Sequence, residues 1–285
     1  MAGKRKRRAT RWGVAALLLI VLTLWTIWGN TAVECNSYTI CSQRLPKSFD
    51  GYKIAHVSDL HNAQLDEGNE KLLQLLRQAR PDMIAITGDL IDSRKLDMET
   101  AMAFIHQAVQ IAPCYYVTGN HEARLETYDA LKDQMETVGV TVLEDETVQI
   151  TKDGQSFTLI GLQDPSFHGV YKPENIEKLA DEQLTRLHTD DSFSVMLFHR
   201  PSYFPVYVSH GVDLVLSGHM HGGQFRLPFL GGVYTPSHGF FPDYDGGLYT
   251  DGNTNMLVSR GLGNSAFPFR FNNRPEIILI QLEAE

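Results

Sequence analysis

Short apolar runs that end in Gly or a polar residue recur along the chain and predict buried β-strands. The clearest runs cover residues 54–58, 83–87, 115–118, 195–198 and 214–217. Between the first two, residues 69–80 carry leucines such as Leu72 and Leu76 on one helical stripe, which Pro81 ends. Alternating strands and helices predict an α/β fold, in which ligands bind beyond the carboxyl ends of the strands.

The rest of the chain continues this alternation. Further helical patterns cover residues 98–111, 124–138 and 174–188. Residues 149–162 predict a hairpin with Asp153-Gly154 as its turn, and residues 277–280 predict a closing strand buried on both faces. Residues 231–247 are rich in Gly, Pro and aromatic side chains. That segment is interpreted as a wall of a site, as a membrane contact or as an ordinary long loop.

Residue types that bind metals come directly after the predicted strands. They are Asp59, His61, Asp89, Asn120, His199, His219 and His221. Oxygen and imidazole ligands without thiolate suit Mn²⁺, Fe or Zn²⁺. Seven ligands are too many for one ion and suit two ions that share a carboxylate. Taken singly, an Asp here is equally an ordinary turn or cap residue, but the set predicts two-metal phosphoester hydrolysis.

The order of these motifs resembles a known family. D-x-H, G-D-x-x-D, G-N-H-E, a lone His and G-H-x-H follow one another from residue 59 to residue 221, as in the calcineurin-like metallophosphoesterases. Segments 222–224, 259–263 and 274–277 are similar to the membrane-associated bacterial branch of that family. The resemblance implies an α/β fold over residues 46–285, in which two mixed sheets pack face to face as a four-layer α/β/β/α sandwich.

The resemblance also implies a dinuclear centre of two divalent metal ions, with Mn²⁺ the first expectation and Fe or Zn²⁺ the alternatives. One ion falls to Asp59, His61 and His221, the other falls to Asn120, His199 and His219, and Asp89 bridges both. Hydroxide bound to the metals then attacks phosphorus. His121 is expected to protonate the leaving oxygen or to stabilise the transition-state charge. Asp92 and Glu122 are expected to orient histidines.

The other histidines receive different interpretations. His56 lies within a predicted strand and is expected to be a buried structural residue. No metal role is expected for the remaining histidines, His106, His168, His188, His210 and His238. For His238, a place in a substrate loop is the alternative.

The amino terminus predicts a membrane anchor. Six basic residues lie in segment 1–11, and the uncharged segment 12–33 follows. At about 1.5 Å per residue this segment is long enough to cross a hydrocarbon core of about 30 Å. The basic flank predicts a cytoplasmic amino terminus and an extracytoplasmic catalytic domain. A cleaved signal peptide and twin-arginine export through Arg7-Arg8 are the alternatives. Residues 34–45 are expected to be a linker.

Charge and cysteine content bear on nucleic-acid binding and on disulfide formation. The chain has 285 residues, 25 basic and 34 acidic, with a net charge of −9. Six basic residues precede the first acid, Glu34, so the remainder carries 19 basic against 34 acidic residues, which disfavours general nucleic-acid binding. Cys35 and Cys41 form a disulfide outside the cytoplasm or stay free thiols. Cys114 is expected to pack in the core.

These observations together predict hydrolysis of a phosphodiester or pyrophosphate at the cell envelope, with lipid-linked phosphates favoured by the anchor. A pyrophosphatase acting on UDP-linked diacylglucosamine is the most specific version. Two other classes are a non-catalytic metal-binding scaffold and a mononuclear phosphate-binding site. The retention of every metal position and of His121 argues against the scaffold.

Overall fold

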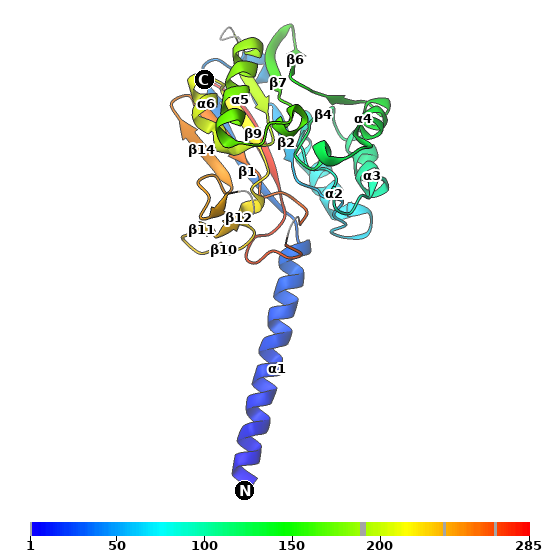
Figure 1. The fold of residues 1–285 in the computed structure, drawn as a ribbon, viewed down its shortest axis with the longest axis vertical. Helices are drawn as coiled ribbons and strands as arrows, with labels where there is room; N and C mark the ends of the chain where they lie inside the picture. Colours follow the sequence, from blue (N-terminus) through cyan, green and yellow to red (C-terminus); the bar gives the residue numbers. More distant parts are fainter. Residues whose placement is uncertain (1, 189–191, 236–237, 265–266) are drawn as a thin grey trace.

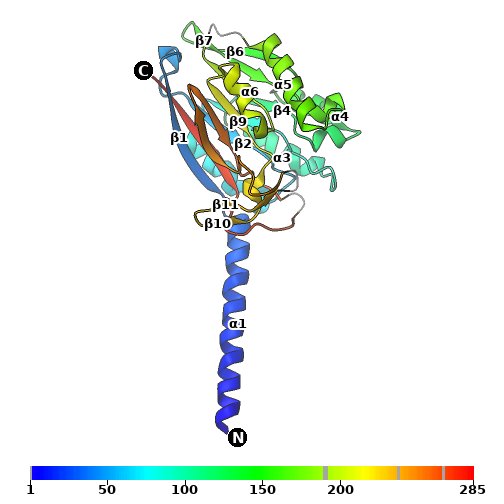
Figure 2. The ribbon, with the colours of Figure 1, turned by 60° about the vertical axis from the view of Figure 1, so that its left-hand side comes forward.

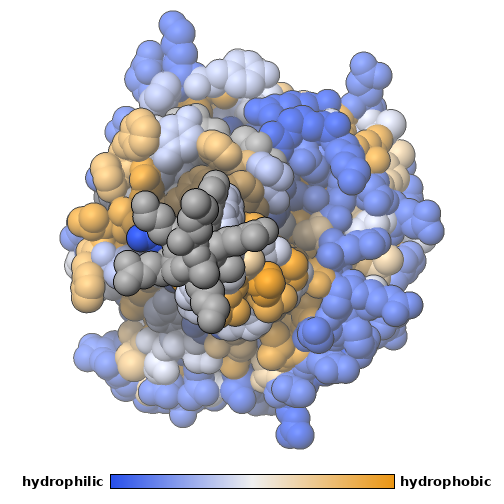
Figure 3. All heavy atoms as spheres, turned by 90° about the horizontal axis from the view of Figure 1, so that it is seen from below, coloured by the Kyte–Doolittle hydropathy of each residue, from blue (hydrophilic) through white to orange (hydrophobic). Residues whose placement is uncertain are grey.

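A long helix, α1 (Ala2–Thr31), stands away from a layered domain formed by the rest of the chain (Figure 1). The structure is a computed structural model that describes residues 2–188, 192–235, 238–264 and 267–285. Within α1, residues Thr10–Thr31 are long and apolar enough to cross a membrane by length and composition, and they are hardly buried. Figure 3 looks at the domain from the α1 end and shows apolar residues beside the helix.

The first sheet carries the earliest predicted strands. Its order is β1 (Glu34–Ser42), β16 (Glu276–Ala284), β2 (Lys53–Val57), β3 (Met83–Thr87), β4 (Cys114–Val117) and β5 (Val140–Val142). Strands β2 to β5 are parallel, whereas β16 runs antiparallel to β2 and parallel to β1. The closing strand expected at residues 277–280 is thus confirmed, and it lies inside the sheet.

The second sheet contains the later strands. Its order is β14 (Gly247–Asp251), β15 (Thr254–Val258), β9 (Leu214–Ser217), β8 (Ser194–Leu197), β7 (Gln155–Gly161) and β6 (Glu146–Lys152). Strands β6 and β7 form the expected hairpin, and both turn residues, Asp153 and Gly154, have positive φ. Residues 231–247 contain short strands rather than a plain loop. The short pairs are β10 (Arg226–Leu227) with β11 (Gly231–Gly232), and β12 (Tyr234–Thr235) with β13 (Gly239–Phe240).

Helices cover the outer face of each sheet and complete four layers (Figure 2). The first sheet is covered by α2 (Glu70–Ala79), α3 (Met98–Ala108) and α4 (Tyr128–Thr137), the second by α5 (Pro173–Leu187) and α6 (Phe204–Ser209). Helix α4 begins later than expected because residues 122–124 form a separate 3₁₀ turn and Leu125 is extended. The remaining 3₁₀ turns span Lys47–Phe49, Glu67–Asn69, Pro165–His168, Pro201–Tyr203 and His221–Gly223.

The strands are buried on both faces, which explains their continuous apolar sequences. Successive side chains of a strand point to opposite faces. Ile54 and Ala85 therefore pack between the sheets, whereas Ala55 and Ile84 pack against the helices. This confirms the four-layer α/β/β/α sandwich.

The boundary expected at residue 46 needs correction. Residues 34–42 form β1, which pairs with β16 along its whole length, so this segment belongs to the domain and is not a linker. Cys35 and Cys41 lie six residues apart on this extended strand, about 20 Å at 3.3 Å per residue. A disulfide needs α-carbons within about 7 Å, so the two cysteines cannot pair with each other within this fold.

We therefore predict that Cys35 and Cys41 both react with a water-soluble maleimide in the native protein, because both are exposed, and that buried Cys114 reacts only after unfolding. Mass spectrometry of the labelled chain should count two adducts without denaturant and three with it. Recovery of a peptide cross-linked between Cys35 and Cys41 would contradict the strand.

Candidate metal centre

The predicted ligands meet where strands of both sheets end. Asp59 and His61 follow β2, Asp89 follows β3, and Asn120 follows β4. His199 follows β8, and His219 and His221 follow β9. All are buried except His219, which is half-buried. The carboxyl ends of five strands thus place these side chains at one edge between the sheets, as the sequence predicted.

One cluster contains Asp59, His61, Asp89 and His221, whose ligand atoms lie within 4.8 Å of one another. Nε2 of His61 is 3.1 Å from Nε2 of His221. The same His221 nitrogen is 3.3 Å from Oδ1 of Asp59. Nitrogens that face each other so closely cannot both donate, which suits a cation between them.

A second cluster contains Asp89, His199 and His219. Oδ2 of Asp89 is 3.3 Å from Nε2 of His199 and 3.5 Å from Nε2 of His61, so one carboxylate oxygen is shared by both clusters. Nδ1 of His219 is 3.2 Å from Nε2 of His199. Asn120 is buried and directly precedes His121, whose backbone N–H donates to Asp89. Its Oδ1 has no hydrogen-bond partner among the described residues.

The backbone at these positions is held in a conformation that side chains rarely adopt. Asp59, His61, Asp89, His219 and His221 all have φ between 47° and 72°. Such left-handed residues cost free energy and cluster at functional sites. Two motif glycines allow the close approach. A Cβ on Gly119 would collide with the Asp89 carboxylate, and one on Gly218 would collide with Ser58 and Asp59.

The charges of the site fit cations. Burial, together with the charge of nearby Asp89, raises the pKa of Asp59 to about 6, although His199 opposes the shift. Burial also disfavours a charged His199, but Asp89 and Asp59 outweigh this effect and raise the pKa of His199 to about 10. Nδ1 of His199 donates to the carbonyl of Thr87 at 2.7 Å, so Nε2, which faces Asp89 and His219, is the nitrogen that would bind a metal in place of a proton. Two buried carboxylates and unpaired imidazole nitrogens form a donor set that fits two divalent cations.

One ring nitrogen of His121, Nδ1, faces Ser93 and Asp92. Its Nδ1 accepts the backbone N–H of Ser93 at 3.0 Å, so a neutral imidazole carries its hydrogen on Nε2. Its ring packs edge-on against His61 with 4.5 Å between centroids. The Asp92 carboxylate lies 3.3 Å from the same Nδ1 and is also bound by Arg94. Burial lowers the pKa of His121, while Asp89 and Asp92 oppose the shift.

Glu122 has a different contact from the one expected. It was expected to orient a histidine, but its fully buried carboxylate accepts backbone N–H groups of Asp89, Ile91 and Gly119, at 2.8 to 3.2 Å. These donors belong to the loops that carry Asp89 and Asn120. Glu122 therefore fixes the spacing of the two loops that carry candidate ligands, and does not orient a histidine ring.

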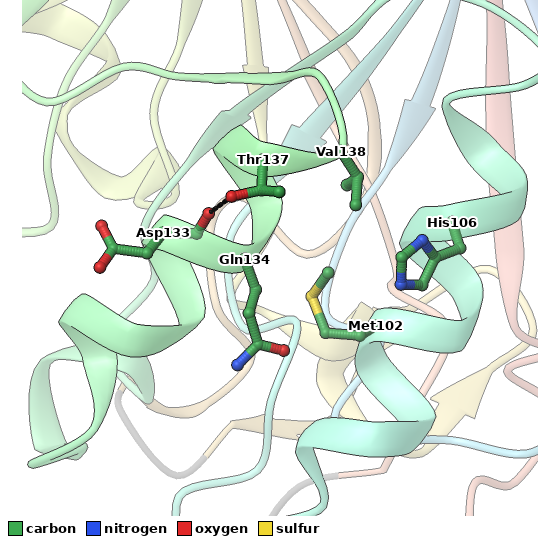
Figure 4. A pocket seen from close by; sticks show the side chains of 6 residues that line it. All are labelled: Met102, His106, Asp133, Gln134, Thr137 and Val138. Carbon is green, nitrogen blue, oxygen red and sulfur yellow. Dashed lines mark hydrogen bonds between the residues drawn. The ribbon is translucent and has the colours of Figure 1, made fainter.

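The other histidines lie outside the two clusters. His56 is buried in β2 and contacts the Thr87 hydroxyl, as expected of a structural residue. His106 lines a separate hollow between α3 and α4 (Figure 4). His168 and His210 pair with Asp145 and Asp181, and His188 contacts Ser194. His238 lies beside His219, with ring centroids 6.0 Å apart, so its segment does reach the site.

Arg270 is a functional candidate that sequence reasoning missed. Its side chain is almost fully buried and lies 3.4 Å from Nδ1 of His221. It donates to the carbonyls of Arg260 and Gly263. Burial lowers its pKa to about 10, so the guanidinium stays charged at neutral pH. No local motif marks it, because it reaches His221 from 49 residues further along the chain.

Comparison with known proteins agrees with this site. The sequence profile described as Calcineurin-like phosphoesterase matches residues 52–223. The "Uncharacterized metallophosphoesterase YkuE" of Bacillus subtilis (strain 168) is 32% identical over 271 residues, covering 88% of this chain and 86% of that protein. "Phosphodiesterase YaeI" of Escherichia coli (strain K12) is 27% identical over 236 residues, covering 81% and 82%.

A "Transmembrane protein with metallophosphoesterase domain" from Bos taurus is 28% identical over 289 residues, covering 94% of this chain and 62% of that protein. The layered fold and the clustered Asp and His side chains are those of a metallophosphoesterase. The chain belongs to the calcineurin-like phosphoesterase family and is a hydrolase of phosphoesters.

We predict that Glu122→Ala lowers the free energy of unfolding by about 3 kcal/mol, because buried donors left unpaired cost about 1–3 kcal/mol each. Urea unfolding followed by circular dichroism would measure the change. Exposed Glu126→Ala, four residues away, is the matched control and should change the free energy by less than about 0.5 kcal/mol. Equal stability of the two variants would show that Glu122 does not hold the loops.

Proposed function

We propose that this protein hydrolyses a phosphodiester or pyrophosphate bond at a dinuclear centre made by the six clustered Asp and His side chains together with Asn120. The observation that carries the proposal is the position of Asp89. Its Oδ2 lies within 3.5 Å of histidine nitrogens from both clusters, as a carboxylate shared by two cations would. A non-catalytic scaffold would not need this shared oxygen, and a mononuclear site would leave one cluster without use.

The chain divides the work among its residues. Asp59, His61 and His221 would hold one ion, Asn120, His199 and His219 would hold the other, and Asp89 would bind both. When bound, such ions neutralise phosphate oxygens and lower the pKa of water so that hydroxide is available near neutral pH. Ser93 fixes the tautomer of His121, so its Nε2–H would donate to a phosphate oxygen or to the leaving group. Glu122 keeps the Asp89 and Asn120 loops at one spacing.

Mn²⁺ is the metal we propose first, because oxygen-containing ligand sets suit it, with Fe or Zn²⁺ as alternatives. The name of the relative YaeI, a phosphodiesterase, supports a diester as substrate. We propose that α1 anchors the chain with its amino terminus in the cytoplasm and the hydrolase outside, as its basic flank favours. A membrane-bound site would meet lipid-linked phosphates, and UDP-linked diacylglucosamine is the specific candidate.

We expect the full-length protein, stripped of metal and reloaded with Mn²⁺, to cleave bis-p-nitrophenyl phosphate faster than p-nitrophenyl phosphate. Asp89→Asn keeps a side chain able to accept the backbone N–H of His121 but loses the bridging charge. This variant should bind fewer than two ions and lose at least about 10³-fold in kcat, the scale typical of lost charge stabilisation. Absorbance assays and metal analysis by mass spectrometry would measure both quantities.

Exposed Asp129→Asn is the matched control and should retain wild-type metal content and rate. Wild-type turnover in Asp89→Asn would contradict the bridging assignment. A chain cut at Pro46 is unsuitable for this work because it lacks β1, an edge strand of the first sheet.

We predict that His121→Gln keeps both ions but lowers kcat for the diester about 10²–10⁴-fold, the contribution typical of a proton donor in the transition state. The control His168→Gln, which changes contacts to Asp145 and Gln183 outside the clusters, should retain full activity. Loss of an ion in His121→Gln would instead make His121 a ligand, together with His61 and Asp92, with which it also forms a cluster.

A further inference from the structure

An apolar rim lies on the domain at the end of α1. This apolar rim consists of large apolar side chains that are exposed to solvent: Leu227, Phe229, Leu230, Phe240, Phe241 and Phe269. Phe229 is fully exposed, at the tip of the turn between β10 and β11. Isolated exposed apolar residues are ordinary, but a contiguous group of this size marks an interaction surface.

Contacts among loop residues join the rim into one surface. Phe225, which directly precedes β10, packs edge-on against Phe267 and Phe269. Tyr234 packs against both Phe240 and Phe267. The two short hairpins and the loop before β16 therefore form one aromatic cluster, and the rim is its outer side.

The end of α1 is bound to this same cluster. The side chain of Asn30 accepts the backbone N–H of Arg270 and donates to the carbonyl of Arg270 at 2.9 Å. The guanidinium of Arg274 lies 4.5 Å from the ring of Trp28 and also pairs with Glu34. Because these contacts tie the helix end to the loop that carries Phe269, the rim cannot move freely away from the helix.

The figures place the rim beside the helix end. In Figures 1 and 2 the β10–β11 hairpin lies at the end of the domain from which α1 emerges. In Figure 3, apolar residues of this face gather around α1 and on the side where β10 and β11 lie, whereas the side of α2, α3 and α4 is largely hydrophilic. A bilayer crossed by Thr10–Thr31 would end next to the rim.

The rim is also adjacent to the metal centre. Asn273 donates to the backbone carbonyl of His221, and Arg270 reaches the ring of the same residue. The segment that leads to Phe229 starts directly after His221. His238, directly before strand β13 and its Phe240, lies with its ring centroid 6.0 Å from that of His219, so a substrate held at the rim would lie close to the metal-ligand candidates.

We propose that this rim inserts into the headgroup region of the bilayer that α1 crosses, and that the site thereby takes phosphoesters whose acyl chains remain in the membrane. Aromatic side chains favour this interface, and apolar contact with it adds to the hold of the helix. The inference rests on the proposed function and anchor. It adds the surface through which a lipid substrate reaches the centre.

The first test measures depth and needs no activity. In a full-length Cys35→Ser/Cys41→Ser background, Phe229→Cys would carry an NBD label in nanodiscs of phosphatidylethanolamine and phosphatidylglycerol, one copy per disc. We expect blue-shifted emission and at least two-fold stronger quenching by doxyl-labelled lipid than at the control Asp153→Cys. Strand β1 starts next to α1 and ends at Ser42, at the opposite end of the domain. Ser48 follows that end and its backbone N–H donates to Gln155, so the neighbouring turn with Asp153 lies far from α1.

Equal quenching at the two positions would overturn the proposal. A blue shift without lipid quenching would overturn it as well, because the label would then be covered by the chain itself. One copy per disc excludes a second molecule as the cover.

The second test compares substrates. Phe229→Ser/Leu230→Ser should keep turnover of a water-soluble diester within two-fold and lose about ten-fold or more on a diacyl phosphodiester in the same nanodiscs. Equal rates or equal losses on both substrates would overturn the role of the rim. Absence of metal-dependent turnover of the soluble diester by the wild type would instead reject the proposed function, and the quenching result would stand by itself.

Discussion

The structure depends on two carboxylates, Asp59 and Asp89, that are buried where the two sheets meet. A buried charge is costly unless it is compensated, and here histidines from both sheets surround the two acids. Asp89 contacts His61 from its own sheet and His199 from the other. Contacts between charged groups of the two sheets thus meet at this site. A cation bound there would stabilise the fold as well as provide the chemistry.

The backbone around the two carboxylates also holds the candidate ligands close together. The candidate ligands with positive φ are in an unfavourable backbone conformation, which only a well-packed environment can maintain. The glycines beside them have no Cβ and so allow neighbouring groups to come close. Glu122 supplies part of that environment by binding three backbone N–H groups, and Arg270 supplies another part from the last loop. The candidate metal centre therefore relies on backbone positions that the sheets and buried polar groups hold in place.

The same last loop connects the site to α1. Asn30 binds Arg270, and Arg270 contacts His221, so the end of the apolar helix and a metal-ligand candidate share one intermediate residue. A mobile tether would leave the direction of the site undefined. A bound helix end, with β1 following at once in the sheet, gives the site one orientation relative to the helix axis.

The sequence by itself determined the strands, most helices and the candidate ligand residues. Hydrophobic period and residue type are local properties that a buried parallel strand or a polar cluster constrains at each position. Five apolar runs became strands, and six of the seven ligand candidates cluster at one edge, with Asn120 buried in the loop after β4. Tertiary structure alone decided that residues 34–42 join the sheet, that Glu122 binds backbone rather than a ring, and that Arg270 reaches His221. Each of these depends on contacts between segments far apart in the chain, and local spacing carries no information about such contacts.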